Sequence, residues 1–418
     1  MRTVALLGSL TKTQRSTFIA SFLGWTLDAF DFFLITFVVV RLSSDFGKTL
    51  TQITFAITIT LVLRPVGAIL FGFLADKYGR RVPLMIDIGF YSVVELLTAF
   101  SPNFTVFLIL RALYGVGMGG EWGVGAALAM ESLPPKSRGF FSGLLQEGYA
   151  FGFLLAGAVY VVVTPHFGWR AMFVVGVLPA LLIFYIRARV PESAVWQAGA
   201  SRGLTSTRHF LDAVLKHWPL FVYAIGLMAA FNFMSHGTQD LYPTFLQRQH
   251  GFNPNYVFII SSIASIGAIC GGILFGTLSQ RFGRRRCIVA AAILGIAMIP
   301  LWAFSSTIAS LAVGGFLMQF MVQGAWGIIP AHLNELSPEG VRGMFPGVVY
   351  QIGNVIAAGA AQIESGVAAS HFRLPSGGAD YGHAMAVVIA VVFGTVILLT
   401  LFGHEAREVE FAHAAAGN

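Results

Sequence analysis

Charged residues are scarce in this chain. Only 11% of its 418 residues are Asp, Glu, Lys or Arg, whereas an average soluble domain has about 25%. Apolar residues make up 56%, and the mean hydropathy is +0.75. This balance excludes a single water-solvated globule, a disordered chain and a nucleic-acid-binding module. It indicates a chain whose solvent is a lipid bilayer.

Cysteine is almost absent. Cys270 and Cys287 lie in apolar stretches and have neither metal-ligand nor disulfide spacing. The sequence also lacks a metal-ligand set and a nucleophile motif. We therefore expect no metal site, no cofactor and no enzymatic activity.

Long apolar stretches dominate what is present. A helix that crosses the hydrocarbon core needs roughly 20 mostly apolar residues. The first such stretch is already of full length, so no cleavable signal peptide is expected. The sequence predicts an all-α membrane protein with twelve transmembrane helices, near 17–40, 52–75, 82–102, 104–130, 140–164, 168–188, 217–240, 256–278, 286–306, 308–331, 343–369 and 382–403.

The net charge of +7 comes from basic residues in short loops between these stretches. The distribution of these residues indicates how the protein is oriented in the membrane. Of the 26 Lys and Arg, 19 are on the side that holds both termini. Positively charged loops are retained in the cytoplasm. We therefore predict an integral protein of the plasma (inner) membrane with both termini cytoplasmic, surrounded by lipid and without a nucleic-acid partner.

The two halves of the chain repeat each other. The segment from Gly72 to Arg81 matches the segment from Gly276 to Arg285 at an offset of 204 residues. This predicts two six-helix bundles in parallel orientation, 1–189 and 217–418, joined by a cytoplasmic linker at 190–216.

The duplication, with G-x-x-x-D-[KR]-x-G-R-[KR] after the second predicted helix, resembles the major facilitator superfamily. The resemblance implies substrate binding between two rocking halves. It also implies a gate at the cytoplasmic side, with Asp76 receiving the N-terminus of a neighbouring helix or a basic partner. The alternative is that these loop charges only set the topology. Gln280 stands at the repeat position of Asp76, so the gate should be asymmetric. The gating candidates are Asp76, Arg80, Arg81, Arg284 and Arg285.

Ionisable residues inside membrane helices are costly, and each is a candidate for function. Asp28 and Asp31 lie on one helix face, where either a proton carrier or a packing tie to Arg64 or Arg111 is expected. Arg64 cannot lose its charge, and its planar fork suits the carboxylate of a substrate.

The other buried candidates divide into two groups. Arg111 opens a Gly-rich segment that resembles the superfamily's proton-transfer motif, and Glu95 and Glu147 are further candidates for proton coupling. Asp87 and Glu121 are expected to join an ion-pair network that stabilises one state of the gate.

The most specific pattern lies in the seventh predicted helix. Asn232, Ser235, His236 and Gln239 follow i, i+3, i+4, i+7 spacing and form one polar stripe on an apolar helix. Four polar groups in one stripe predict a cavity wall. At the offset of 204, Asn232 and Ser235 correspond to Asp28 and Asp31.

Residues 232–244 match N-x-x-[ST]-H-x-[ST]-Q-D-x-x-x-T, so the chain resembles the Jen-type lactate and pyruvate permeases of the sialate:proton symporter family. The resemblance implies a monomeric, proton-coupled monocarboxylate symporter. A sialic acid or other organic-acid or dicarboxylate carrier is the alternative. The expected substrate contacts are Arg64, Tyr149, Asn232, His236, Gln239, Gln351 and Asn354, and the expected proton-coupling residues are Asp28, Asp31, Glu95, Arg111, Glu147 and Asp240.

Overall fold

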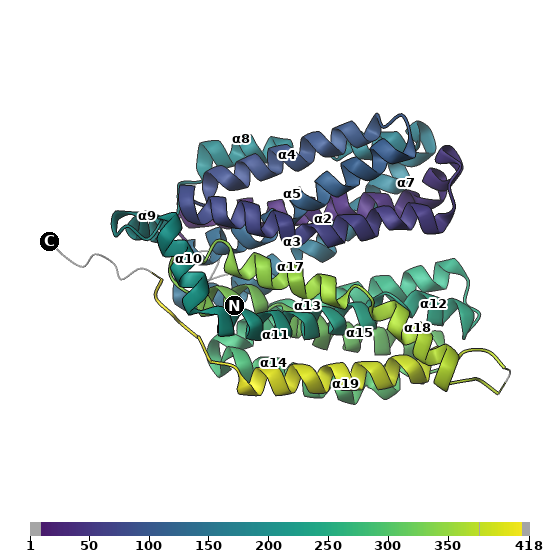
Figure 1. Ribbon diagram of the computed structural model, residues 1–418. Coiled ribbons are helices and arrows are strands. Elements are labelled where there is room, and N and C mark those ends of the chain that lie inside the picture. Colours follow the sequence, from purple (N-terminus) through teal and green to yellow (C-terminus); the bar gives the residue numbers. More distant parts are fainter. Residues whose placement is uncertain (1–9, 376, 412–418) are drawn as a thin grey trace.

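The computed structural model describes residues 10–375 and 377–411, in which the regular structure is helical. Figure 1 shows two helical groups side by side, with α9 (Ala194–Ser201) and α10 (Thr207–Lys216) at one end of both. The N-terminal bundle contains α2 (Lys12–Phe46), α3 (Leu50–Tyr78), α4 (Arg81–Ala99), α5 (Phe104–Ser132), η1 (Pro135–Ser137), α6 (Arg138–Gln146), α7 (Gly148–Val175) and α8 (Ala180–Arg189). The C-terminal bundle contains α11 (Trp218–Gln239), α12 (Tyr242–Arg248), α13 (Pro254–Phe282), α14 (Arg284–Ala303), α15 (Ile308–Trp326), α16 (Ile329–Leu336), α17 (Phe345–Ala357), α18 (Ala360–His371) and α19 (Tyr381–Phe402).

Local capping signals explain where several of these helices begin. Thr11 and Thr49 each accept a hydrogen bond from the backbone three residues on, and a Gln at that position bonds back to the cap. Asn103 caps α5 with its side chain in the same way. The long apolar segments that follow stay helical, because in lipid only an internal hydrogen bond satisfies each backbone group.

The sequence repeat is also a structural repeat. Helix α13 begins and ends 204 residues after α3, and α15 begins 204 residues after α5. One ion pair repeats as well, since Arg80–Glu131 in the first bundle corresponds to Arg284–Glu335 in the second. The prediction of a duplicated helical unit is confirmed.

Within the described residues, ten helical stretches are long and apolar enough to cross a membrane, against twelve predicted. The continuous stretch Pro135–Arg189 has 55 residues and covers the two predicted helices 140–164 and 168–188. The chain kinks between them at Gly168, whose φ is 75°. The predicted helix 343–369 is broken between α17 and α18, so neither piece reaches the full length. The predicted helix 308–331 lies within the candidate membrane span Ile308–Leu336, which has a short turn between the end of α15 at Trp326 and the start of α16 at Ile329.

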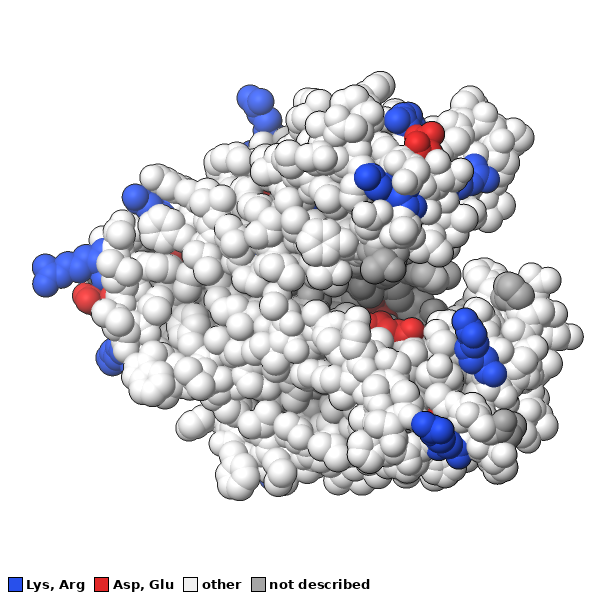
Figure 2. All heavy atoms as spheres, turned by 45° about the vertical axis from the view of Figure 1, so that its right-hand side comes forward, with Lys and Arg blue, Asp and Glu red and all other residues white. Residues whose placement is uncertain are grey.

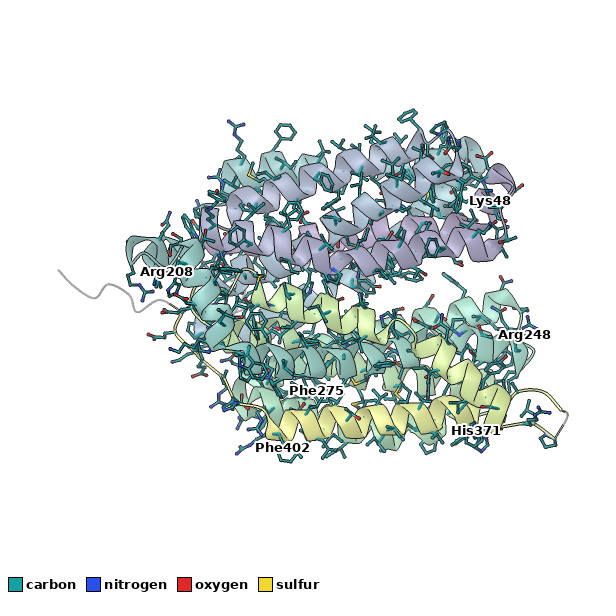
Figure 3. The ribbon with its side chains drawn as sticks, in the orientation of Figure 1. Lys48, Arg208, Arg248, Phe275, His371 and Phe402 are labelled. Atoms are coloured by element: carbon teal, nitrogen blue, oxygen red, sulfur yellow. The ribbon has the colours of Figure 1, made fainter. Side chains whose placement is uncertain are left out.

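The two ends of the molecule differ. We call the end at which α9 and α10 lie the linker end and the opposite end the cleft end. Arg208 lies at the linker end, whereas Lys48 and Arg248 lie at the cleft end (Figure 3). Figure 2 shows a cleft that separates the two bundles at the cleft end, with acidic atoms inside it.

At the linker end the bundles touch through glycine. Helix α6 packs against α13, and α17 packs against α3 and α5. A Cβ atom added at Gly143 would overlap the carbonyl oxygen of Gly272, and one added at Gly139 would lie 2.5 Å from that of Gly276. Only residues without a side chain allow the two helices to approach this closely.

We therefore expect Gly143→Ala to lower the free energy of unfolding by about 1–3 kcal/mol, because the added methyl group overpacks the contact. Gly226→Ala is the matched control: Gly226 lies in α11 with no atom within 4 Å of an added Cβ. That change should leave stability equal or slightly higher, as Ala favours helix. The thermal-unfolding midpoints of both variants in detergent measure the difference, and equal midpoints would contradict the prediction.

Candidate functional site: a cavity between the two bundles

The cleft leads into two adjoining cavities that side chains of both bundles line. The first, the arginine compartment, has a volume of about 280 Å³ and is lined by Arg64, Asn232, His236, Asp240 and Asn354 among others. The second, the glutamine compartment, has about 480 Å³ and is lined by Gln146, Glu147, Gln319 and Gln323 among others. Tyr149, Gln239 and Asp240 line both compartments.

Arg64 is a buried cation that makes no ion pair with the described carboxylates, although Asp28 lies within electrostatic range. Its side chain projects from α3, and the residue is 2% exposed. Among the described residues no carboxylate oxygen lies within the 4.0 Å of an ion pair. The guanidinium contacts the Met118 sulfur and lies 4.9 Å from the centre of the Phe32 ring. The strongest positive charge in the cavity wall is thus available to a carboxylate that enters from outside the protein.

Across from Arg64, three side chains form a chain of hydrogen bonds. His236 Nδ1 lies 3.0 Å from Asp240 Oδ2, and His236 Nε2 lies 2.9 Å from Asn354 Oδ1. Both neighbouring atoms are oxygens, so a doubly protonated imidazole donates to each. The sequence analysis predicts Asp240 as a proton-coupling residue, and in the structure it lies in the cavity wall beside His236.

A second polar group includes two residues that the sequence analysis did not identify, Gln319 and Gln323. The Gln239 amide donates to Gln319 Oε1 at 2.9 Å and to Ser235 Oγ at 3.1 Å. Gln323 donates to Ser235 at 3.4 Å from the same side. Gln319 and Gln323 are four residues apart on the apolar helix α15, and this i, i+4 spacing is the signal that could have revealed them.

Two carboxylates of α2, Asp28 and Asp31, do not line either compartment. Asp28 and Asp31 are 0% exposed inside the N-terminal bundle, and their oxygens have no hydrogen-bond partner among the described residues. Neither carboxylate forms an ion pair with Arg64 or Arg111 among the described residues, because Arg111 pairs with Glu95 and Asp28 is only in electrostatic range of Arg64. Asp31 lies in electrostatic range of both members of that pair.

Three further expectations need correction or restriction. Asp87 and Glu121 are fully buried and make no ion pair in the described part of the chain, so the predicted network is wrong. Gln351 is 1% exposed, its amide has no partner among the described atoms, and it is absent from the walls of both compartments. Its predicted contact with substrate therefore has no support in this arrangement.

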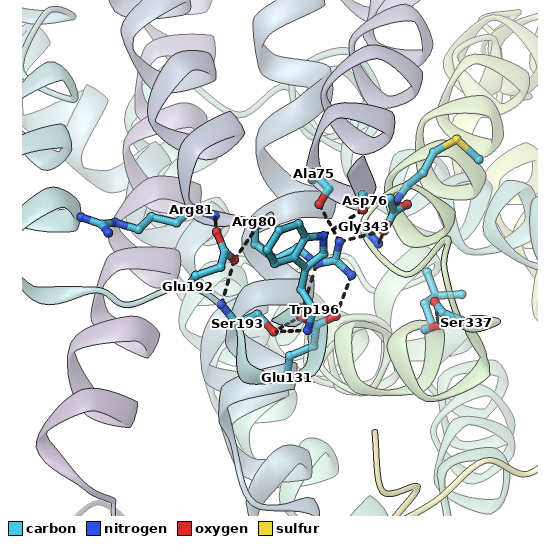
Figure 4. A network of polar contacts seen from close by, with 12 residues as sticks. Ala75, Asp76, Arg80, Arg81, Glu131, Glu192, Ser193, Trp196, Ser337 and Gly343 are labelled. Carbon is cyan, nitrogen blue, oxygen red and sulfur yellow. Dashed lines mark hydrogen bonds and ion pairs between the residues drawn. The ribbon is translucent and has the colours of Figure 1, made fainter. Parts of the chain in front are cut away.

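Three of the predicted gate residues, Asp76, Arg80 and Arg81, belong to a network of polar contacts at the linker end, which Figure 4 shows. Asp76 Oδ1 and Oδ2 accept the backbone N–H groups of Gly343 at 2.7 Å and Met344 at 3.0 Å, just before α17 of the other bundle. Arg80 joins Asp76 to Glu131 through ion pairs of 2.8 and 2.9 Å. Burial is the largest single effect on the pKa of Arg80 and lowers it. The nearby carboxylates of Glu131 and Asp76 together outweigh burial, so the pKa of Arg80 is raised.

The loop that follows each bundle contributes one carboxylate to that bundle's own set of contacts. Glu192 accepts the backbone N–H groups of Arg80 and Arg81 at the start of α4, and Glu405 accepts those of Arg284 and Arg285 at the start of α14. Both carboxylates therefore stabilise helix N-termini. At the repeat position of Asp76, Gln280 accepts a single bond from the described residues of the other bundle, from Gly139 N–H at 3.1 Å.

In the part of the chain that the structure describes, no group of three or more His, Cys, Asp and Glu side chains is placed to hold a metal ion. The cavity instead presents one cation, one imidazole–carboxylate pair and several amides. Such a set binds a small polar molecule through hydrogen bonds and charge.

Comparison with known proteins agrees with this reading. The family model described as Major Facilitator Superfamily matches residues 21–362. The carboxylic acid transporter protein homolog of Saccharomyces cerevisiae is 31% identical over 93% of this chain and 68% of its own. The sialic acid transporter NanX of Escherichia coli is 29% identical over 94% of each chain.

Solved structures show the same fold. The proton:xylose symporter XylE gives a TM-score of 0.74 at 18% identity, covering 95% of this chain and 97% of that one. FucP in the outward conformation gives 0.69 at 14% identity, covering 93% and 99%.

Two bundles built from a duplicated helical unit, with a polar cavity between them, define a membrane transporter for small molecules. The chain belongs to the Major Facilitator Superfamily. It is a transporter and not an enzyme, and the predicted fold of two six-helix bundles is confirmed.

Proposed function

We propose that this protein is a proton-coupled symporter of a small monocarboxylate such as lactate or pyruvate. Arg64 carries the proposal, because it is a buried cation in the cavity wall with no internal anion within ion-pair distance among the described residues. A substrate carboxylate supplies the missing partner with two parallel hydrogen bonds.

The remaining groups of the arginine compartment orient the substrate. His236 and Asn354 offer hydrogen bonds to a carbonyl or hydroxyl group, and Asn232 and Gln239 line the same wall. Tyr149 stacks on Trp25, with ring centres 5.6 Å apart, and closes one side of the cavity. These contacts suit a small anion with one more polar group.

The named relatives support the organic-acid class. They include a carboxylic acid transporter homolog, a sialic acid transporter and a probable 4-methylmuconolactone transporter. Acidic groups for the coupled proton are available in Asp28, Asp31, Glu95 with Arg111, Asp240 and Glu147.

We propose that the linker end faces the cytoplasm of an inner-membrane protein that works as a monomer. Residues 1–189 and 217–418 then rock about the cavity, and residues 190–216 connect them. The anion and one proton enter from the cleft end together, so the loaded transporter carries no added charge.

Uptake of labelled L-lactate into proteoliposomes under an inward proton gradient tests the proposal. A gradient of one pH unit should sustain about a tenfold accumulation of the anion. Unlabelled pyruvate should compete, and succinate should not, because the cavity offers no second free cation among the described residues. Folded protein that shows no gradient-driven uptake of lactate or pyruvate would contradict the proposal.

The glutamine compartment favours a second candidate, a larger hydroxylated acid such as sialic acid. Its volume of about 480 Å³ exceeds the need of lactate, and its amides suit hydroxyl groups. In the same assay, N-acetylneuraminate would then be the stronger competitor.

A further inference from the structure

Seven buried carboxylates have oxygens without a hydrogen-bond partner among the described residues: Asp28, Asp31, Asp87, Glu95, Glu121, Glu147 and Glu364. Of these seven, only Glu147 is among the residues that line the two compartments. Glu147 also contacts the opposite bundle, because a Cβ added at Gly272 of α13 would overlap its carboxyl group. Glu147 therefore connects the substrate cavity with the contact that closes the linker end.

We propose that Glu147 binds the proton that is transported with the substrate, an inference that rests on the proposed function. The residue is 2% exposed, at the junction of α6 and α7. A carboxylate buried without a partner is costly, so the packed arrangement favours the neutral acid. One proton added to the carboxylate removes that cost.

Among the described residues, no Lys or Arg side chain lines the compartment beside Glu147. Helix α13 presents Gly272, and α2 presents Trp25 and Thr26 beside the next residue, Gly148. The same compartment is also lined by the neutral groups of Tyr149, Tyr242, Gln319 and Gln323. The one other charged residue that lines this compartment is Asp240, which is paired with His236.

The position of Glu147 explains how one carboxyl group can exchange its proton with either side of the membrane. With the cleft open, the cavity gives the proton access from the cleft end. When the bundles rock and α6 separates from α13, Gly272 no longer covers the carboxyl group. Water from the linker end then solvates the carboxylate, and the proton leaves on that side.

Glu147→Gln keeps the shape and the neutral state but cannot release a proton. We expect it to lose proton-driven accumulation of labelled L-lactate, so that the tenfold ratio expected for the parent at one pH unit falls to about one. Counterflow, the exchange of internal for external lactate without a gradient, should be retained. The parent's counterflow should fall as the pH rises, whereas that of the variant should not change with pH.

Glu121→Gln is the matched control, because Glu121 is also buried and unpartnered but lines neither compartment. It should accumulate lactate as the parent does. Accumulation by Glu147→Gln, or equal uncoupling in Glu121→Gln, would overturn the inference. If Glu147→Gln loses both accumulation and counterflow, Glu147→Asp distinguishes the explanations. Restored accumulation in Glu147→Asp supports proton binding. Loss of both fluxes in Glu147→Asp as well would show that the side chain has only a packing role and would overturn the inference. A parent that counterflows but ignores the gradient would instead overturn the proton coupling of the proposed function, and this inference with it.

Discussion

Replacing Arg64 with Gln is expected to abolish carboxylate transport and, at the same time, to raise the thermal stability of the substrate-free protein. The transport loss follows from the missing charge. Removing one partner of a buried, hydrogen-bonded charge pair costs about 2–5 kcal/mol, so uptake at low substrate concentration should fall at least about 30-fold. The stability gain follows because Arg64 is buried and none of the described carboxylates lies within ion-pair distance of it. Removing such a charge removes its desolvation cost.

These opposite signs distinguish a binding role from a structural one. If Arg64 were a packing tie, its loss would lower stability and transport together. Initial rates of uptake in proteoliposomes and unfolding midpoints in detergent measure the two effects. Arg64→Lys should bind the anion more weakly than the parent, because a single ammonium group cannot make the bidentate contact.

Arg170→Gln is the control for loss of an arginine. Arg170 pairs with Asp45 at the cleft end, and both side chains are nearly half exposed. An exposed ion pair contributes about 0–1 kcal/mol, so this variant should transport and unfold almost as the parent does. Unchanged uptake in Arg64→Gln would move the carboxylate contact to other groups of the cavity.

Asp76→Asn is expected to open the linker end and slow transport. The Asp76 carboxylate accepts two backbone N–H groups of the other bundle and is held by Arg80. A hydrogen bond to a charged group contributes about 1.5–3 kcal/mol. Loss of the charge should therefore shift the equilibrium between the two states of the transporter by roughly 10–150-fold.

The distance between labels at Lys48→Cys and Arg248→Cys reports this shift, because both positions lie at the cleft end (Figure 3). The native Cys270 and Cys287 are first replaced by Ala. Asp76→Asn should shorten the mean distance as the cleft closes and the linker end opens.

Gln280→Ala is the matched control, since Gln280 occupies the repeat position but accepts a single bond from Gly139 across the interface. Its effect on the distance should be smaller than that of Asp76→Asn. Equal effects of the two changes would show that the carboxylate has no special part in closing this end.

Several features of the protein follow from sequence alone because they depend on local or repeated patterns. Membrane helices are visible as long apolar stretches, and the offset of 204 residues relates α3 to α13 to the residue. The polar stripe of Asn232, Ser235, His236 and Gln239 is a property of one helix, and all four residues line the arginine compartment. A helix has one polar face, so its spacing predicts which residues stand together.

Breaks within predicted helices were less visible. The interruption between α17 and α18 falls in an apolar segment without a proline at the break. The interruption between α15 and α16 is followed by Pro330, which cannot donate to the carbonyl of Trp326 four residues earlier. An apolar stretch predicts that a segment lies in the membrane, but its packing against other helices decides whether it stays straight.

The choice of charge partners was decided only by the tertiary structure. Arg111 pairs with Glu95 of α4 and not with Asp28 or Asp31, and Arg64 pairs with none of the described carboxylates. Likewise, the contact of Glu147 with Gly272 joins segments that are distant in sequence. Spacing determines which residues share a helix face, but the rotation and packing of the helices determine which faces meet, and therefore which buried charges are neutralised and which remain for a substrate or a proton.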